Sequence, residues 1–133
     1  LELVPLEGSL VLGGMTFEPL PVLHGRLEIL GYRFGDSAYI SDASAIPEGT
    51  LARLEGLELL VIDALRFRPH ITHISIHEAL ALVERLRPRR SYFTHIAHDV
   101  LHQEVEEGLR DRLSGYWAPG EVHLAWDGLK LEV

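Results

Sequence analysis

One apolar run constrains the fold of this chain more than any other feature. Residues 57–64, LELLVIDA, are almost continuously apolar, which is typical of a strand buried on both faces of a sheet. Downstream, Ser75 and Glu78 have the spacing of a capping box, and apolar residues then recur at the interval of one helical face. A buried strand followed by an amphipathic helix predicts an α/β fold.

The remaining elements follow from apolar periodicity and from turn residues. Before the run we expect strands at residues 1–6, 9–12, 15–23, 27–34 and 38–40, and a short helix at residues 47–55. After it we expect a helix that Pro88 ends, a strand at 91–94, a helix at 99–113, and a hairpin of 122–126 with 129–133 around Asp127-Gly128. Pro19 and Pro21 favour an edge position for their strand. This order predicts a mixed sheet with helices over one face and an apolar, uncovered second face.

Composition excludes several classes of protein. The 133 residues make at most one domain, and no apolar stretch approaches the about 20 residues that span a bilayer, so we expect no membrane contact. Without cysteine there is neither a disulfide nor a thiolate metal site, which fits a cytoplasmic protein. A net charge of −8 argues against charge-driven binding of nucleic acid. The basic residues at 85–90 favour a helix end and a solvated turn over a phosphate site.

Three polar side chains follow predicted strands directly. His24 follows the strand at 15–23, Asp42 the strand at 38–40 and His95 the strand at 91–94. Loops at strand ends of α/β sheets bring together residues that are distant in sequence. Imidazole and carboxylate suit Zn²⁺ or Mn²⁺. Taken singly, each residue has an ordinary alternative, a surface histidine or a turn-forming aspartate.

These three residues stand within a series of ordered segments. The segments are Val22-Leu23-His24-Gly25, Ala38-Tyr39-Ile40-Ser41-Asp42, Leu60-Val61-Ile62-Asp63-Ala64-Leu65-Arg66, Pro69-His70-Ile71-Thr72-His73, Thr94-His95-Ile96-Ala97-His98-Asp99 and Ala125-Trp126-Asp127-Gly128. Together they resemble a known family, the phosphodiesterases of the metallo-β-lactamase superfamily, from about Pro21 to the C-terminus. The likeness is strongest to phosphoribosyl 1,2-cyclic phosphate phosphodiesterases, with ribonuclease Z more distant.

The resemblance implies an αββα metallo-β-lactamase fold, of which residues 1–133 would be the C-terminal half. It implies that His24 binds a first metal ion, that Asp42 bridges two, and that His95 binds the second. The cofactors would be two divalent ions, Zn²⁺ or Mn²⁺, which activate hydroxide for attack on phosphorus.

The resemblance also implies roles for other histidines. His73, just before the helix at Ser75, is expected to protonate the leaving alkoxide, since a histidine titrates near neutrality. The alternative is that His73 only bonds the helix N-terminus. His98 and His70 are candidate substrate-binding residues, with a supporting or solvent-facing role as the alternative for each. Asp63, at the end of the buried strand, is a candidate supporting residue.

The leading signature of the family, His-x-His-x-Asp-His, is absent from these residues. We therefore expect the N-terminal half to have been removed, to be present but unseen, or to lie on another chain, and we expect this fragment alone to be inactive. The sequence predicts an intact enzyme that hydrolyses a small phosphodiester, with a small cyclic phosphate as the expected substrate. The alternatives are a ribonuclease Z-like nuclease and a non-catalytic half-domain that binds a metal or a partner. A homodimer is expected.

Overall fold

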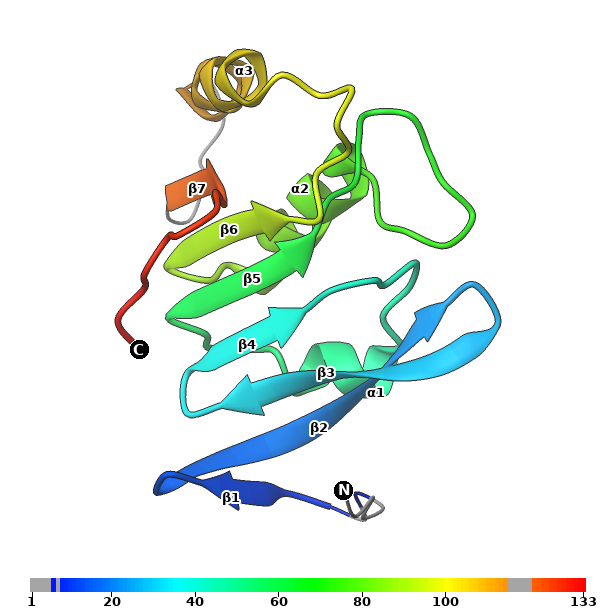
Figure 1. The fold of residues 1–133 in the computed structure, drawn as a ribbon, viewed down its shortest axis with the longest axis vertical. Helices are drawn as coiled ribbons and strands as arrows, with labels where there is room; N and C mark the ends of the chain where they lie inside the picture. The colour runs from blue at the N-terminus through cyan, green and yellow to red at the C-terminus, as the bar shows by residue number, and fades with distance from the viewer. Residues whose placement is uncertain (1–5, 7, 115–120) are drawn as a thin grey trace.

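In a computed structural model, residue 6, residues 8–114 and residues 121–133 can be described, and they form a single sheet flanked by helices (Figure 1). The expected strand at residues 1–6 therefore lies almost entirely outside the described residues. The strands stand in the sheet in chain order, from β1 to β7. Their bounds are β1 (Leu10–Leu12), β2 (Met15–His24), β3 (Leu27–Phe34), β4 (Ser37–Ile40), β5 (Leu59–Asp63), β6 (Arg90–Thr94) and β7 (Glu121–Leu124). The helices are α1 (Glu48–Ala52), α2 (Ile76–Leu86) and α3 (His102–Ser114).

The direction of pairing changes at β4. Strands β1 to β4 pair antiparallel, whereas β4, β5, β6 and β7 pair parallel. Antiparallel neighbours are joined by short turns, and each parallel pair is joined by a longer connection that carries α1, α2 or α3. The mixed sheet that the sequence predicts is therefore confirmed.

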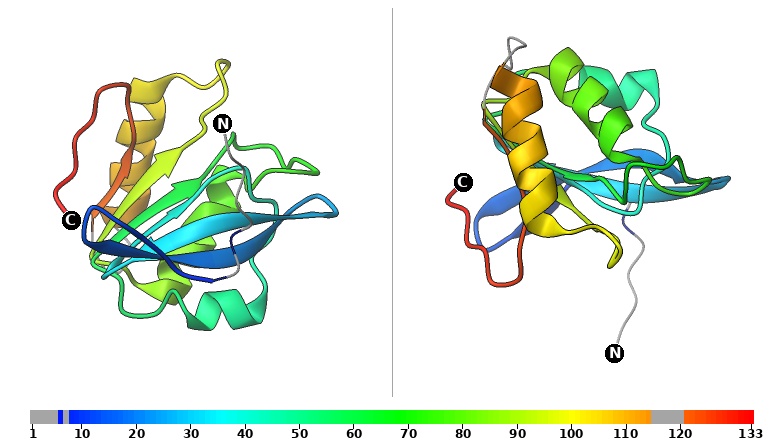
Figure 2. Two further views of the ribbon diagram at one scale, coloured as in Figure 1. Left: turned by 60° about the horizontal axis from the view of Figure 1, so that its bottom comes forward. Right: turned by 90° about the horizontal axis from the view of Figure 1, so that it is seen from above.

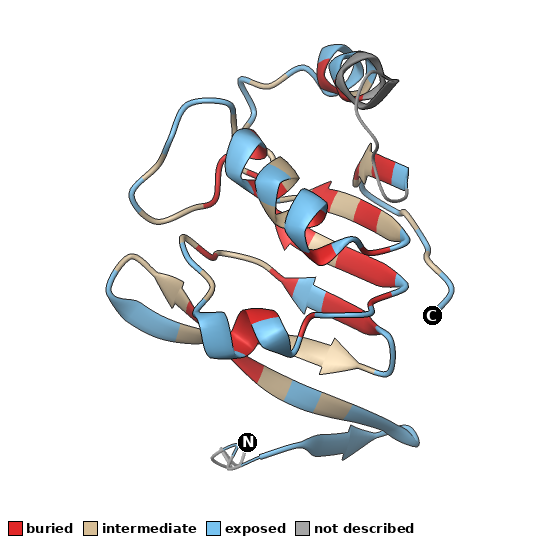
Figure 3. Cartoon of the chain, turned by 180° about the vertical axis from the view of Figure 1, so that it is seen from behind, coloured by how far each residue is buried: buried red, intermediate tan, exposed pale blue. Residues whose placement is uncertain are grey.

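The core lies between the sheet and the helices. Two rows of register partners on one face are buried, Ala38–Leu60–Ser91–Val122 and Ile40–Ile62–Phe93–Leu124. Helices α1 and α2 lie over this face (Figure 3), and Val105 and Leu109 of α3 join the same core. The capping box of α2 forms as expected, with Ser75 Oγ bonded to the Glu78 backbone N–H. The prediction of helices over one face is confirmed.

No described helix lies over the opposite face of the sheet (Figure 2), and a row of apolar and aromatic residues runs across that face. Tyr32 and Tyr39 are register partners there, and the row continues through Val61 and Tyr92. Tyr39 is 45% exposed. The predicted uncovered face is therefore present in the part of the chain that the structure describes.

Two expectations about strands need correction. β2 is not an edge strand, because β1 pairs with its first residues, Met15 to Phe17. Pro19 and Pro21 lie beyond the residues that pair with β1, so their missing N–H groups remove no hydrogen bond to β1. The prediction of a terminal hairpin is also wrong. The Asp127-Gly128 turn forms, with the Leu129 N–H bonded to the Trp126 carbonyl at 3.0 Å, but residues 129–133 form no strand. The turn fixes only local dihedrals, while β7 pairs with β6.

The helix predicted at residues 99–113 begins instead at His102, and Leu101, which precedes it, is 63% exposed. Among the described residues no helix has the length and apolar character needed to cross a membrane.

Two of the basic residues at the end of α2 and just beyond it, Arg85 and Arg89, form ion pairs. Arg85 reaches both carboxylate oxygens of Glu48 at 2.9 and 2.5 Å and thereby connects α2 to α1. Arg89 lies 3.2 Å from Glu58. The hydrogen bonds from Arg85 lower the pKa of Glu48 below its ordinary value. The predicted preference for a solvated helix end over a phosphate site is consistent with these pairs.

Candidate metal centre

The candidate residues meet at one edge of the sheet because of strand direction. β2 runs in the same sense as β4, β5 and β6, so the carboxyl ends of all four strands lie at the same edge (Figure 1). His24 and Asp63 are the last residues of their strands, and Asp42 and His95 follow theirs within two residues. Asp42 and His95 both have a φ of 60°, a left-handed conformation in which Asp and His are enriched among non-glycine residues.

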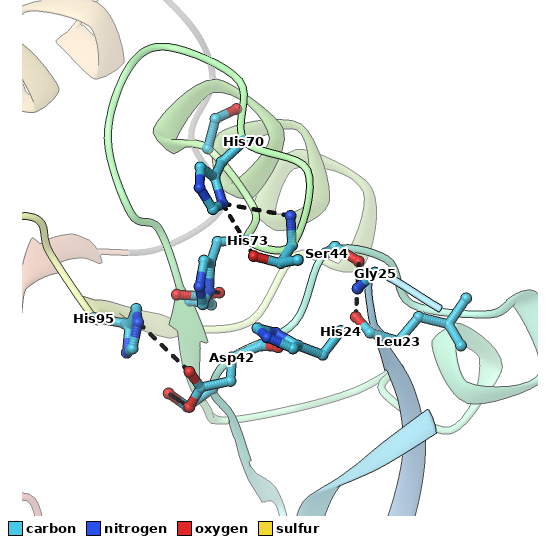
Figure 4. Close-up of polar contacts among 12 residues, drawn as sticks. Leu23, His24, Gly25, Asp42, Ser44, His70, His73 and His95 are labelled. Atoms are coloured by element: carbon cyan, nitrogen blue, oxygen red, sulfur yellow. Dashed lines mark hydrogen bonds and ion pairs between the residues drawn. The ribbon is translucent and has the colours of Figure 1, made fainter. Parts of the chain in front are cut away.

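His73 lies at the centre of a cluster of imidazole rings (Figure 4). Its ring centroid is 4.7 Å from that of His95, 4.9 Å from that of His24 and 5.1 Å from that of His70. The loop that precedes α2 brings His73 here, because the Ile74 N–H bonds the Ala43 carbonyl at 2.6 Å, directly beside Asp42. A loop residue is thus placed among strand-end residues.

His24 has one ring nitrogen committed to the backbone. Its Nδ1 lies 2.8 Å from the carbonyl oxygen of Asp42, which only accepts, so Nδ1 carries the hydrogen and donates. The Nε2 atom of His24 is then left with a lone pair, which is the form of imidazole that binds a metal ion.

Two groups of potential ligand atoms share His73, and the carboxylate of Asp42 belongs to the first group and lies close to His95 of the second. The ligand atoms of His24, Asp42 and His73 all lie within 4.8 Å of one another, and so do those of Asp63, His73 and His95. Asp42 Oδ1 is also 3.5 Å from His95 Nε2. Among the described residues, His24 and His95 fall in different groups, and Asp42 reaches both. A carboxylate close to both His24 and His95 fits the binding of divalent ions, and the donor set suits Zn²⁺ or Mn²⁺.

The solvent exposure of the side chains rises from Asp63 to Asp42 across the cluster. The side chain of Asp63 is fully buried and that of His73 is 13% exposed, whereas those of His95 and Asp42 are 36% and 50% exposed. The cluster therefore opens to solvent on the side of Asp42 and His95, where a ligand can enter.

His73 pairs with the fully buried Asp63, with His73 Nδ1 at 3.2 Å from Asp63 Oδ2. Burial raises the pKa of Asp63 to about 7, against the opposing effect of His95. Burial also lowers the pKa of His73 from its ordinary value, and the nearby His95 and His24 lower it further. The pair can therefore share a proton near neutral pH, and His73 Nε2, which does not contact Asp63, remains available to a ligand.

The structure brings four of the predicted residues, His24, Asp42, His73 and His95, into one cluster, and His70 stacks against its outer side. Thr72 holds the His70 ring, with its Oγ1 3.1 Å from Nδ1. His98 is exposed in the loop after β6 and makes none of the described contacts with the cluster. Its role in substrate binding stays a prediction.

Ser44 also contributes to this edge of the sheet, and the sequence alone does not identify it. Ser44 bonds the backbone on both sides of His24, yet a serine in a loop is too common to stand out. Its position two residues after Asp42 is the only local signal.

Residues 2–96 match the family model described as the beta-lactamase superfamily domain. This chain belongs to that superfamily. The match covers more than half of the chain and includes the strands that end at His24, Asp42, Asp63 and His95. The mixed sheet with flanking helices is therefore part of a metallo-β-lactamase fold, as the sequence predicts.

The chain is also similar to individual proteins. A crystal structure of a diphosphatase from the PhnP family superposes with a TM-score of 0.84 at 41% identity, over 96% of this chain and 46% of that one. The metallo-β-lactamase fold protein YhfI from Bacillus subtilis has a TM-score of 0.71 at 19% identity, over 92% and 52%, and supports the fold alone. An octanoyltransferase from Porphyromonas gingivalis is 35% identical over 118 residues, which are 87% of this chain and 22% of that protein. The chain thus spans less than half of the diphosphatase and about a fifth of the octanoyltransferase.

Proposed function

We propose that this chain forms one side of a metal-dependent site that hydrolyses phosphodiesters of small molecules, with a small cyclic phosphate as the expected substrate. The observation that carries the proposal is that the Asp42 carboxylate shares a group of potential ligand atoms with His24 and also lies 3.5 Å from His95 Nε2. The similarity to a diphosphatase at 41% identity supports phosphoryl chemistry and adds a diphosphate as a substrate to be tested.

Three side chains would hold the ions: His24 through Nε2, Asp42 through its carboxylate, and His95 through its ring. When bound, divalent ions supply Lewis-acid stabilisation of phosphoryl oxygens and lower the pKa of water. Three side chains are too few to close two such sites, because structural and catalytic zinc sites each use three or four protein ligands. The remaining ligands would lie in residues outside these 133.

His73 would act as the proton donor to the leaving oxygen. Asp63 holds the ring by its contact with Nδ1, so Nε2 is the nitrogen that would carry the proton to the leaving oxygen, and the ring centroids of His24 and His95 lie 4.9 and 4.7 Å from that of His73. His73 is more buried than Asp42 and His95, and this burial lowers the pKa of its ring, so the protonated ring is a stronger acid toward the leaving oxygen.

The test uses the intact protein with Mn²⁺ or Zn²⁺ and bis-p-nitrophenyl phosphate, a cyclic ribose phosphate and a nucleoside diphosphate. We expect Asp42→Ala to abolish hydrolysis and to lower the metal content, and His73→Ala to abolish hydrolysis with the metal content unchanged. The control is His102→Ala, an exposed histidine at the start of α3. Normal turnover by Asp42→Ala would refute the proposal, and loss of metal from His73→Ala would make His73 a ligand.

A second candidate function is hydrolysis of an acyl ester or thioester. It is favoured by the match to a segment of an octanoyltransferase, although that segment is only 22% of the protein and need not contain its transferase activity. Hydrolysis of an octanoyl thioester at a higher kcat/KM than any phosphate substrate, with loss of that activity in Asp42→Ala, would favour this candidate.

A further inference from the structure

The hydroxyl of Ser44 joins the two segments that carry His24 and Asp42 (Figure 4). Ser44 Oγ donates to the carbonyl of Leu23 at 2.9 Å and accepts from the N–H of Gly25, also at 2.9 Å. These two peptide groups lie on either side of His24. One side chain in the loop after β4 therefore fixes the backbone before and after a residue at the end of β2.

The ring of His24 is held from the same loop. Its Nδ1 donates to the carbonyl of Asp42, two residues before Ser44. The hydroxyl thus fixes the backbone of His24 while the Asp42 carbonyl fixes its ring, and both partners lie on one three-residue segment. A change in the position of this segment relative to β2 would alter the His24 backbone, its tautomer and its distance from the Asp42 carboxylate together.

We infer that Ser44 is a positioning residue for the metal centre: its hydroxyl sets the separation and orientation of His24 and Asp42. The metal part of this inference rests on the proposed function, whereas the effect on the His24 ring does not. Residues that orient metal ligands commonly change affinity by about 10–100-fold when they are removed. The alternative is a serine that only stabilises the loop.

Ser44→Ala removes both side-chain bonds but leaves the segments attached. The backbone N–H groups of Ser44 and Ala45 still donate to the Leu23 carbonyl at 2.6 and 3.3 Å, and the Leu23 N–H still donates to the Ala45 carbonyl at 2.9 Å. The variant should therefore fold. Ser44→Thr keeps a hydroxyl at the same position and should restore the parent behaviour.

Thr50→Val is the matched control. Thr50 Oγ1 donates to the carbonyl of Pro21 at 2.7 Å, so this threonine also bonds the β2 backbone through a hydroxyl, but at a position three residues before His24. A merely structural role predicts that Thr50→Val and Ser44→Ala have the same effect on every measurement. A positioning role predicts that only Ser44→Ala changes the metal centre.

Two measurements on the intact protein test the inference. Titration calorimetry with Zn²⁺ should show affinity reduced about tenfold in Ser44→Ala, restored in Ser44→Thr and unchanged in Thr50→Val. In the metal-free protein, the chemical shifts of the His24 ring nitrogens are measured by NMR at a pH above the titration range of histidine. They should show the Nδ1–H tautomer in the parent and a mixture of both tautomers in Ser44→Ala.

An affinity for Zn²⁺ in Ser44→Ala within twofold of the parent would overturn the inference, as would an equal loss in Thr50→Val. If the parent binds no Zn²⁺, the tautomer decides alone, and an unchanged His24 tautomer in Ser44→Ala overturns it. Weakened Zn²⁺ binding in Ser44→Ala, with no hydrolysis by the parent, would support the inference while refuting the proposed function.

Discussion

Replacement of Gly31 by alanine should destabilise the fold at the joint between β3 and β4. Gly31 is a buried residue of β3, and a Cβ built on it would lie 3.0 Å from the Tyr39 carbonyl oxygen and 3.0 Å from Ile40 Cγ1. The carbonyl belongs to the backbone of β4 and cannot rotate away as a flexible side chain can. The two strands must therefore separate to make room for the methyl group.

The magnitude follows from two opposing effects. Overpacking of a close-packed core costs about 1–3 kcal/mol. Alanine regains roughly 0.5–1 kcal/mol over glycine within a strand, because glycine loses more conformational freedom on folding. We expect the free energy of unfolding of Gly31→Ala to fall by about 1–2 kcal/mol. With a urea m-value of about 1–3 kcal/mol/M, the midpoint should fall by on the order of 1 M.

The assay is urea unfolding of the parent and of two glycine variants. Gly108→Ala is the control, since this glycine lies in α3 and a Cβ on it would meet nothing within 4 Å; it should stabilise the protein by up to about 1 kcal/mol. A midpoint for Gly31→Ala equal to or above that of the parent would refute the steric argument. Because Ile40 is two residues before Asp42, Gly31→Ala should also weaken metal binding.

Three further predictions concern single contacts. Asp63→Asn presents an amide to His73 Nδ1, so kcat should fall at least about tenfold with unchanged metal content, measured by steady-state kinetics and elemental analysis; full activity would contradict the role of the pair. Ser75→Ala removes the capping box of α2 and should lower the free energy of unfolding by about 1 kcal/mol, measured by urea unfolding. Glu48→Gln removes an ion pair that lowers the pKa of Glu48 in the folded state. The ion pair stabilises the fold at a pH above the pKa of Glu48 in the unfolded state, and this stabilisation disappears as the pH falls through the pKa of Glu48 in the folded state. The variant should therefore have a lower urea midpoint than the parent at neutral pH and the same midpoint in acid.

Local signals were enough to predict much of the fold. The capping box of α2 and the buried strand β5 depend on neighbouring residues, and both form as expected. The terminal hairpin failed because strand pairing is not local. A turn at Asp127-Gly128 brings the chain round, but the partner of β7 is β6, and the Arg90 side chain donates to the Glu132 carbonyl at 3.2 Å.

The candidate centre was predictable where it depends on strand ends. His24 ends its strand and Asp42 and His95 follow theirs, and strands that run in the same direction bring their carboxyl ends to one edge. The central position of His73 was not predictable from spacing, because it depends on a loop that folds back to bond Ala43. The pairing of His73 with the buried Asp63 depends on the same loop.

The left-handed backbone at Asp42 and His95 has a consequence for how this centre can change by mutation. A side chain with a Cβ loses roughly 1–2 kcal/mol in that conformation, and β-branched residues lose most. Glycine at either position should therefore give a more thermostable protein than alanine does, although both variants remove the side chain. Selection for heat resistance alone would thus favour loss of these two residues, and a library randomised at both positions should yield its most robust members without the metal centre.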